Sequence, residues 1–179
     1  MEIILTICYA AVFSFVILKW KWFVDIQVHK FLFVALFLLK ILTGIFAMEL
    51  YEYRYNGGDA GSFIKFSKPI TESFYKSPGD FLGMVTGIGD DEEFMKKHGA
   101  ISGWNNMDVV YNDNRTILRL NGFIGLFSMG FSYIHIVFFA FISMMGLMGI
   151  YKASRLLTNR PPYLLVLAVF MVPGVLFWL

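Results

Sequence analysis

Residues 31–50, FLFVALFLLKILTGIFAMEL, decide the fold class, because only Lys40 interrupts their apolar character before Glu49. A helix of this length rises about 30 Å, which matches the hydrocarbon core of a bilayer. Three other stretches have a similar character: 3–20, 120–151 and 163–179. The four runs predict an all-α polytopic membrane protein with about four transmembrane helices, forming one membrane domain over residues 1–179.

The composition supports this class. Apolar residues make up 58% of the 179 residues and charged residues 16%, and 18% are aromatic. Soluble domains carry about 25% charged residues and cannot bury so large an apolar surface. The net charge of +2 is too small for an electrostatic nucleic-acid binder, so we expect no nucleic acid. Cys8 is the only cysteine, which excludes a disulfide within the chain.

The charges of the connecting segments predict an orientation. Lys19, Lys21 and Lys30 lie between the first two runs, and Lys152, Arg155 and Arg160 precede the last run. Loops rich in lysine and arginine stay in the cytoplasm. Residues 51–116 carry ten acidic and seven basic residues, so we expect them to form a large external loop. We interpret the first run as a retained span rather than a signal peptide.

The third run is uncharged for 32 residues, too long for one crossing and too short for two. It predicts either a tilted helix or an interfacial helix ending near Gly130 followed by a span from residue 131. The small residues at 122, 125, 143, 146 and 149 are typical of close helix packing. Because residues 177–179 are still apolar, we expect further helices of the same or another chain to accompany these runs.

The external segment contains enough apolar residues for short interfacial helices. Ser67 before Pro69 and Ser77 before Pro78 are predicted helix starts. Residues 89–99 predict another helix, with acids at its start and basic residues at its end. We interpret the acidic cluster at 90–93 as a solvated helix end rather than a cation site, so neither a metal nor a cofactor is expected.

Residues 51–61, YEYRYNGGDAG, present a carboxylate at the expected membrane surface. Asp59 lies close in sequence to Arg54 and Lys65. A carboxylate so placed can act as general base on a substrate hydroxyl while cations hold a phosphate leaving group. A polar turn with a surface acid explains the same residues, and both interpretations remain open.

Three other residues bear on function. Trp104, followed by two asparagines, offers an aromatic face and amides that suit a sugar, although ordinary turns use the same residues. Lys40 lies at the centre of a span, where a lysine is a candidate functional residue unless it snorkels or pairs with a carboxylate on another helix. We interpret His135 as a packed or interfacial histidine rather than a ligand.

The order of these parts resembles the front of bacterial polytopic glycosyltransferases of the GT-C type and related polysaccharide polymerases. The shared parts are an early span, an acid beyond it in a large external loop, Arg119-Leu120-Asn121 leading into a span, and a basic turn before a proline-containing span. The resemblance implies that Asp59 is the catalytic acid, with Glu52 as the next choice. It also implies a polyprenyl-linked sugar donor whose phosphate meets Arg54 or Arg119.

We therefore expect a multi-pass protein of the bacterial inner membrane that transfers or polymerises lipid-linked sugars in cell-surface polysaccharide biosynthesis. The candidate site residues are Asp59 and Glu52 for catalysis and Arg54, Lys40, Trp104 and Arg119 for the substrate. One alternative is a non-catalytic membrane subunit that binds a partner protein through its external loop and glycine-rich helix. Another is a transporter fragment that uses Lys40.

Overall fold

The computed structural model describes residues 1–24, 27–55, 58–88 and 114–177, and over these residues the chain is all-α. It divides into two compact units. We call Met1–Tyr51 together with Ile136–Leu179 the span unit, and Glu52–His135 the inserted unit. Each unit is described by itself.

The span unit contains α1 (Glu2–Lys19), a short 3-10 helix η1 (Lys21–Phe23), most of α2 (Lys30–Tyr55) and most of α8 (Ser132–Leu157). It ends with α9 (Pro162–Phe170) and α10 (Pro173–Phe177). Within the described residues, three helices are long and apolar enough to cross a membrane, namely α1, α2 and α8. The predicted all-α class is confirmed, and the three candidate spans coincide with the first three apolar runs.

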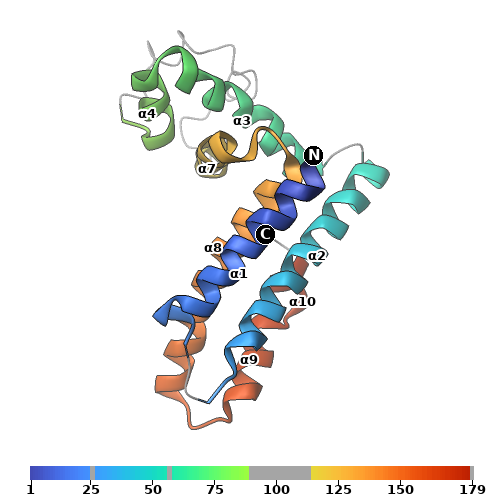
Figure 1. Cartoon of the computed structure of the whole chain (residues 1–179), viewed down its shortest axis with the longest axis vertical. Coiled ribbons are helices and arrows are strands. Elements are labelled where there is room, and N and C mark those ends of the chain that lie inside the picture. The colour runs from blue at the N-terminus through green and yellow to red at the C-terminus, as the bar shows by residue number, and fades with distance from the viewer. Residues whose placement is uncertain (25–26, 56–57, 89–113, 178–179) are drawn as a thin grey trace. The chain divides into compact units, whose positions relative to one another are not determined.

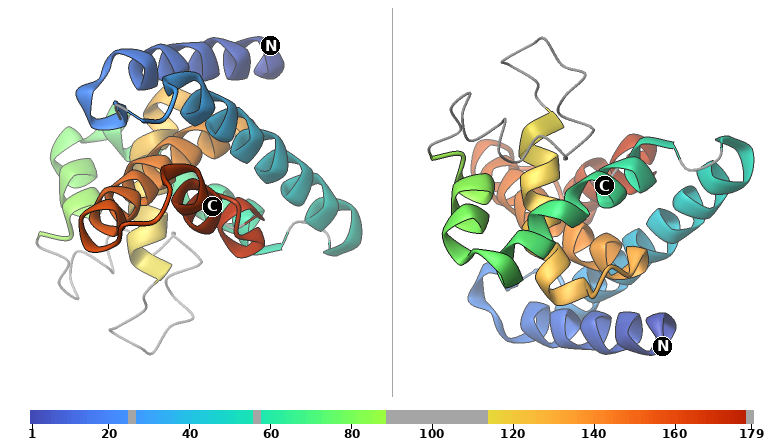
Figure 2. Two further views of the ribbon diagram at one scale, coloured as in Figure 1. Left: turned by 90° about the horizontal axis from the view of Figure 1, so that it is seen from below. Right: turned by 90° about the horizontal axis from the view of Figure 1, so that it is seen from above.

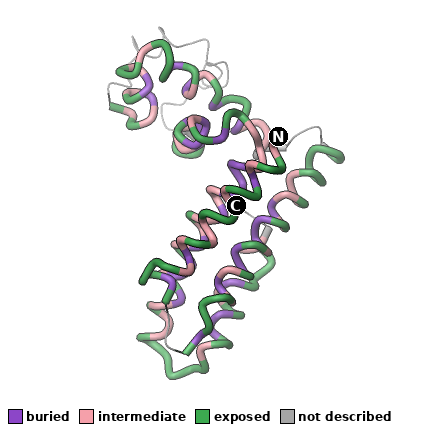
Figure 3. Tube along the Cα trace, in the orientation of Figure 1, coloured by how far each residue is buried: buried purple, intermediate pink, exposed green. Residues whose placement is uncertain are grey.

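Large aromatic side chains fill the centre of the span unit. Phe13 of α1 stacks on Phe141 of α8 with 4.4 Å between ring centroids, and Phe33 of α2 contacts Tyr151 and Phe170. The outer faces are also apolar, because α1 leaves residues such as Ile3, Ile4 and Ile7 exposed. Buried and exposed positions are interspersed along the helices (Figure 3). Apolar exposure outside an apolar core is typical of a surface in contact with lipid.

The last apolar run is not one continuous helix. It is divided into α9 and α10, and Met171 and Val172 separate them. Pro173 lacks an N–H and its ring clashes with the carbonyl group four residues earlier, so a helix cannot pass through it undisturbed. The fourth predicted span is therefore two short helices.

The two basic segments of the span unit lie at the same end (Figure 1). The Trp22 indole N–H donates to the carbonyl oxygen of Met145 in α8 at 3.2 Å. A second link is the 3.0 Å hydrogen bond from the Arg155 guanidinium to the side-chain oxygen of Gln27. The ends of α2 and α8 that lead into the inserted unit are the opposite ones.

The inserted unit is built from α3 (Gly58–Lys76), α4 (Pro78–Thr86) and α7 (Asn114–Ser128). Ile70, Phe81, Met84 and Leu118 form its core. Ser77 caps α4, since its hydroxyl accepts a hydrogen bond from the Asp80 N–H, and Pro78 follows at the first helical position. That predicted helix start is confirmed.

The helix start predicted at Ser67 is wrong. The helix α3 runs from Gly58 to Lys76 and includes Pro69. The Ser67 hydroxyl is buried and donates to the carbonyl oxygen of Ile64 inside the helix. Packing of α3 against α7 stabilises a continuous helix although Pro69 removes one backbone hydrogen bond.

The long third run is interrupted where the second interpretation placed the interruption. The helix α7 ends at Ser128, and α8 begins at Ser132. Between them Met129 and Gly130 have φ values of 52° and 82°. Two successive residues with positive φ reverse the chain, so the run forms one helix of the inserted unit and one candidate span.

Two glycines allow α3 and α7 to approach closely, as the sequence predicted. A Cβ atom on Gly122 would lie 2.6 Å from the Ile70 side chain, and one on Gly125 would lie 2.0 Å from the Thr71 hydroxyl oxygen. That hydroxyl donates to the carbonyl oxygen of Gly122 at 2.9 Å. Gly146 of α8 differs, because nothing lies within 4 Å of a Cβ placed there.

We predict that Gly125→Ala destabilises the protein by about 1–3 kcal/mol, because Thr71 must leave its position and its hydrogen bond. Gly146→Ala is the matched control. It adds a methyl group in open space inside a helix, so it should leave stability unchanged or raise it by up to about 1 kcal/mol. Unfolding titrations in mixed detergent micelles measure both changes. Equal stability of the two variants would contradict the close packing.

Candidate functional site: a polar pocket in the inserted unit

One face of α3 carries a polar stripe. The stripe consists of five polar residues with the spacing of a single helical face, and Ile64 precedes them on the same face. The five are Ser67, Lys68, Thr71, Glu72 and Tyr75. Ser67 is buried, Thr71 is half-buried, and the three long polar side chains are exposed. The stripe therefore has hydroxyl groups near the helix surface and charges farther out.

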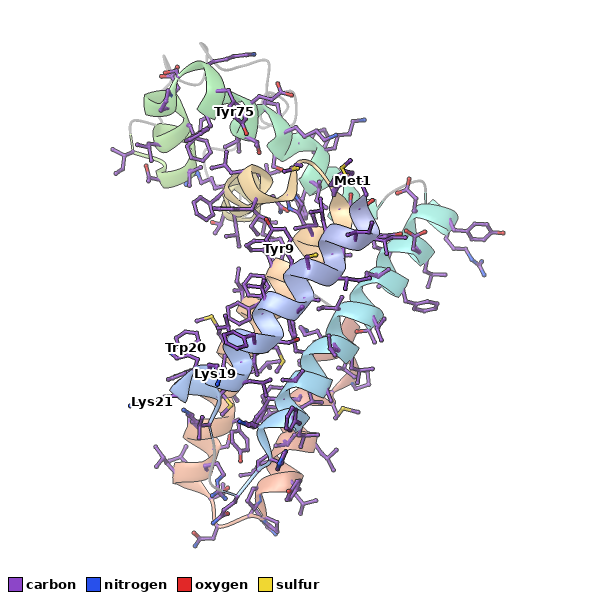
Figure 4. The ribbon with its side chains drawn as sticks, in the orientation of Figure 1. Met1, Tyr9, Lys19, Trp20, Lys21 and Tyr75 are labelled. Carbon is purple, nitrogen blue, oxygen red and sulfur yellow. The ribbon has the colours of Figure 1, made fainter. Side chains whose placement is uncertain are left out.

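This stripe lines a cavity of about 440 Å³. The other walls come from the end of α7, the turn after it and the first turn of α8, through Gly125, Leu126, Met129, Gly130 and His135. Tyr75 is marked on α3 in Figure 4. Pockets for small molecules usually span about 300–1,000 Å³, so the cavity has the size of a binding site.

A buried hydrogen-bond network fixes His135 in the pocket wall. Its Nδ1 lies 2.8 Å from Oδ1 of Asn121, and its Nε2 lies 2.8 Å from the Ser128 hydroxyl oxygen. The amide nitrogen of Asn121 donates to the carbonyl oxygen of Ile117, which leaves Oδ1 as the acceptor facing the ring. Nδ1 therefore carries the proton, and Nε2 of the neutral ring accepts from Ser128.

The order serine, histidine and asparagine has the hydrogen-bond pattern of a nucleophile, a base and an orienting group. However, Ser128 has no exposed surface, so its oxygen is inaccessible to a substrate. The same oxygen accepts a hydrogen bond from the Gly130 N–H at 3.2 Å. The network therefore holds the α7–α8 turn and orients His135, and we assign it no covalent chemistry.

The remaining groups define what the pocket can bind. The hydroxyls of Ser67 and Thr71 donate to backbone carbonyl groups, so toward a ligand they offer acceptor oxygens. Glu72 adds carboxylate acceptors, whereas Lys68 adds three donors and a positive charge. The pocket thus suits a molecule that combines an anionic group with several hydroxyl groups.

Three of the predicted site residues do not line this pocket. Among the described residues that line the pocket there is no Glu52, Arg54 or Arg119. Glu52 and Arg54 are exposed in the last turns of α2. Arg119 packs its guanidinium against Gly87, where a Cβ atom would lie 2.6 Å from it. Gly87 ends α4 with a φ of 74°, so Arg119 stands at a helix C-terminus, where a positive charge is favourable.

Several predictions fall on residues that the structure does not describe. Asp59 lies in the first turn of α3, but its side chain is outside the described part. Trp104, the acidic cluster at 90–93 and the helix predicted at 89–99 also lie outside it. The base and the aromatic sugar contact therefore stay predictions.

Lys40 of the span unit has a partner that neither sequence interpretation included. Its buried ammonium group donates to the carbonyl oxygen of Val175 in α10. One turn farther along α2, the Thr43 hydroxyl donates to the carbonyl oxygen of Leu176 at 2.9 Å. Both carbonyl groups belong to α10 (Pro173–Phe177). Lys40 and Thr43 therefore link α2 to α10.

The sequence reasoning missed the polar stripe of α3, although the signal was present. Lys68, Thr71, Glu72 and Tyr75 have spacings of three and four residues, which place them on one helical face. They are polar positions between the apolar residues Phe66, Ile70 and Phe74. The second wall could not be predicted, because it depends on how α7 packs on α3.

The fold and the pocket define the class of protein only broadly, as an all-α chain with three candidate membrane spans and an inserted helical unit. Comparison with models of protein families, with curated proteins and with solved structures finds no match.

We predict that Asn121→Ala lowers the free energy of unfolding by about 1–3 kcal/mol, because it leaves a buried N–H of His135 without its acceptor. In a His135→Leu background the same substitution should cost less, since the donor is already gone. A double-mutant cycle from unfolding titrations measures this coupling. Fully additive effects would contradict the network.

We also predict that Lys40→Met changes global stability little but loosens α10. A central lysine costs about 2.5–3.5 kcal/mol on insertion scales, and a hydrogen bond from a charged group returns about 1.5–3 kcal/mol. These terms nearly cancel, whereas the hydrogen bond that links α2 to the Val175 carbonyl group of α10 is lost. Amide hydrogen exchange of residues 173–177 should therefore accelerate, and the exposed Lys30→Met should leave it unchanged. Unchanged exchange in Lys40→Met would contradict the proposed role of Lys40 in holding α10.

Proposed function

We propose that this chain is a multi-pass protein of the bacterial inner membrane that takes part in the transfer or polymerisation of sugars from a polyprenyl-linked donor. The pocket of the inserted unit receives the sugar-phosphate part of that donor. The observation that carries the proposal is the combination, in one cavity, of a lysine, a carboxylate and several hydroxyl oxygens.

The connectivity supports an external position for the inserted unit. The two basic segments share one end of the span unit, and the chain enters and leaves the inserted unit from the other ends of α2 and α8. Basic segments stay in the cytoplasm, so the inserted unit faces the outside. Polyprenyl-linked sugars that build surface polysaccharides are presented on that side.

The pocket chemistry supports a phosphorylated sugar as ligand. Lys68 attracts the phosphate through charge-assisted hydrogen bonds. Glu72 and the oxygens of Ser67 and Thr71 accept hydrogen bonds from sugar hydroxyls, and the Tyr75 ring offers a face to the apolar side of the sugar.

Two carboxylates compete for the role of base. Asp59 is the choice implied by the resemblance to GT-C enzymes, and Glu72 is the carboxylate of the described pocket. They are thirteen residues apart in α3, which corresponds to about 20 Å along a helix. They therefore belong to different sites, and separate substitutions distinguish them.

We predict that Lys68→Met weakens binding of a polyprenyl-phosphate-linked sugar about 10- to 100-fold, as expected for a lost charge-assisted hydrogen bond. Lys76→Met is the matched control, since Lys76 is an exposed residue of the same helix that is not among the described lining. Binding is measured with purified protein in lipid nanodiscs. Equal affinities of the two variants would exclude the pocket as the phosphate site.

The same preparation tests catalysis. Sugar transfer to an acceptor is measured for Glu72→Gln and Asp59→Asn, with Glu49→Gln of the span unit as the control. Loss of transfer with retained donor binding in one variant identifies the base. Absence of transfer and of donor binding in the unchanged protein would overturn the enzymatic proposal.

The alternative is a non-catalytic subunit that binds a partner protein through its glycine-rich helix, and the contacts of the glycines give it less support. Gly122 and Gly125 contact Ile70 and Thr71 of the same chain, so these positions already have a partner helix. Gly146 is open on the surface of α8. A partner protein would therefore have to approach the span unit at Gly146 rather than at the glycines of α7.

A further inference from the structure

The span unit joins two groups of basic residues that are far apart in the sequence. Lys19, Lys21 and Lys30 surround the link between α1 and α2, and Lys152, Arg155 and Arg160 surround the end of α8. Contacts of Trp22 and Gln27 with α8 bring the groups together. The six basic residues are accompanied in these segments by one acidic residue, Asp25. We call this surface the basic end.

Three lysines of the basic end lie against aromatic rings. Lys152 Nζ is 4.6 Å from the centre of the Trp22 ring, and Lys19 Nζ is 5.7 Å from that of Phe15. Lys30 Nζ lies 6.0 Å from the Phe31 ring centre. An aromatic ring attracts a cation but leaves its charge intact, whereas a carboxylate would neutralise it. These ring contacts therefore leave the positive charge of the three lysines intact.

Two tryptophans indicate where the basic end would lie relative to the bilayer. Trp20 and Trp22 are 42% and 38% exposed, so each indole combines a buried part with an accessible part. Indoles with this exposure prefer the headgroup region of a bilayer. Lys19, Trp20 and Lys21 follow one another at the end of α1 (Figure 4). Seen from below, the end of α1 and the start of α2 lie near each other (Figure 2).

We propose that the basic end is a binding site for anionic phospholipid headgroups. The phosphate lies among Lys21, Lys152 and their neighbours, and the acyl chains extend along the apolar outer faces of α1 and α8. The attraction to anionic lipid amounts to about a fivefold gain in affinity per lysine near the surface. The site is independent of the pocket in the inserted unit, so either proposal can fail without the other.

Native mass spectrometry of the purified full chain tests this proposal. Phosphatidylglycerol and phosphatidylcholine are the probes, because they differ in net charge. We expect the unchanged protein to retain phosphatidylglycerol preferentially. The double variant Lys21→Gln/Lys152→Gln should lower that preference about 25-fold, at about fivefold per lysine. The matched control is Lys65→Gln/Lys76→Gln, which removes the same charge from exposed positions of the inserted unit.

Further arms separate the remaining explanations. Lys19→Gln/Lys30→Gln repeats the test without disturbing the contact between Lys152 and Trp22, and circular dichroism verifies that each variant is folded. Inorganic phosphate should displace the lipid no better than chloride of equal ionic strength. Equal retention of both lipids, equal losses in the basic-end and control variants, or specific displacement by phosphate would each overturn the proposal.

Discussion

The constraint on which this structure depends is that backbone polar groups in apolar surroundings need partners within the protein. Continuous helices meet this requirement everywhere except at their ends. The described chain contains two interruptions within apolar runs, after Ser128 and after Phe170. At the first, the Ser128 hydroxyl accepts the Gly130 N–H and is held in turn by His135. Beyond the second, Lys40 and Thr43 donate to carbonyl groups of α10. Buried polar side chains thus supply hydrogen bonds next to both interruptions.

The two units solve helix packing in different ways. In the span unit, rings such as Phe13, Phe37 and Phe141 lie between the helices and fill the space with apolar surface. In the inserted unit, Gly122 and Gly125 of α7 have no side chain, so side chains of α3 occupy the space next to their Cα atoms. Aromatic packing gains energy from area and shape, whereas glycine contacts gain from close backbone approach. The second arrangement fixes the relative register of its helices more strictly.

The sequence predicted the features that follow from length and charge. The 32-residue run was too long for one span, which led to the interruption near Gly130, and the loop charges predicted that the basic segments share an end. Local rules failed where packing decides. Ser67 begins no helix because α7 stabilises α3 across Pro69, and the Pro173 break divides a run that hydropathy alone treats as continuous. The network of Asn121 and His135 joins residues fourteen positions apart across a chain reversal, so no spacing rule identifies it.

The polar pocket has two kinds of lining residue: a floor of buried or half-buried residues, Thr71 and His135, and a rim of exposed residues, Lys68, Glu72 and Tyr75. Thr71 is oriented by the Gly122 carbonyl group, and His135 is held on both ring nitrogens, so these floor groups cannot turn to suit a ligand. The long side chains of Lys68, Glu72 and Tyr75 are exposed and can adapt. A floor of this kind discriminates by shape and acceptor position, while the rim contributes charge. Thr71 packs against Gly125 of α7 and also lines the pocket. The packing of α3 on α7 therefore directly determines the geometry of the site.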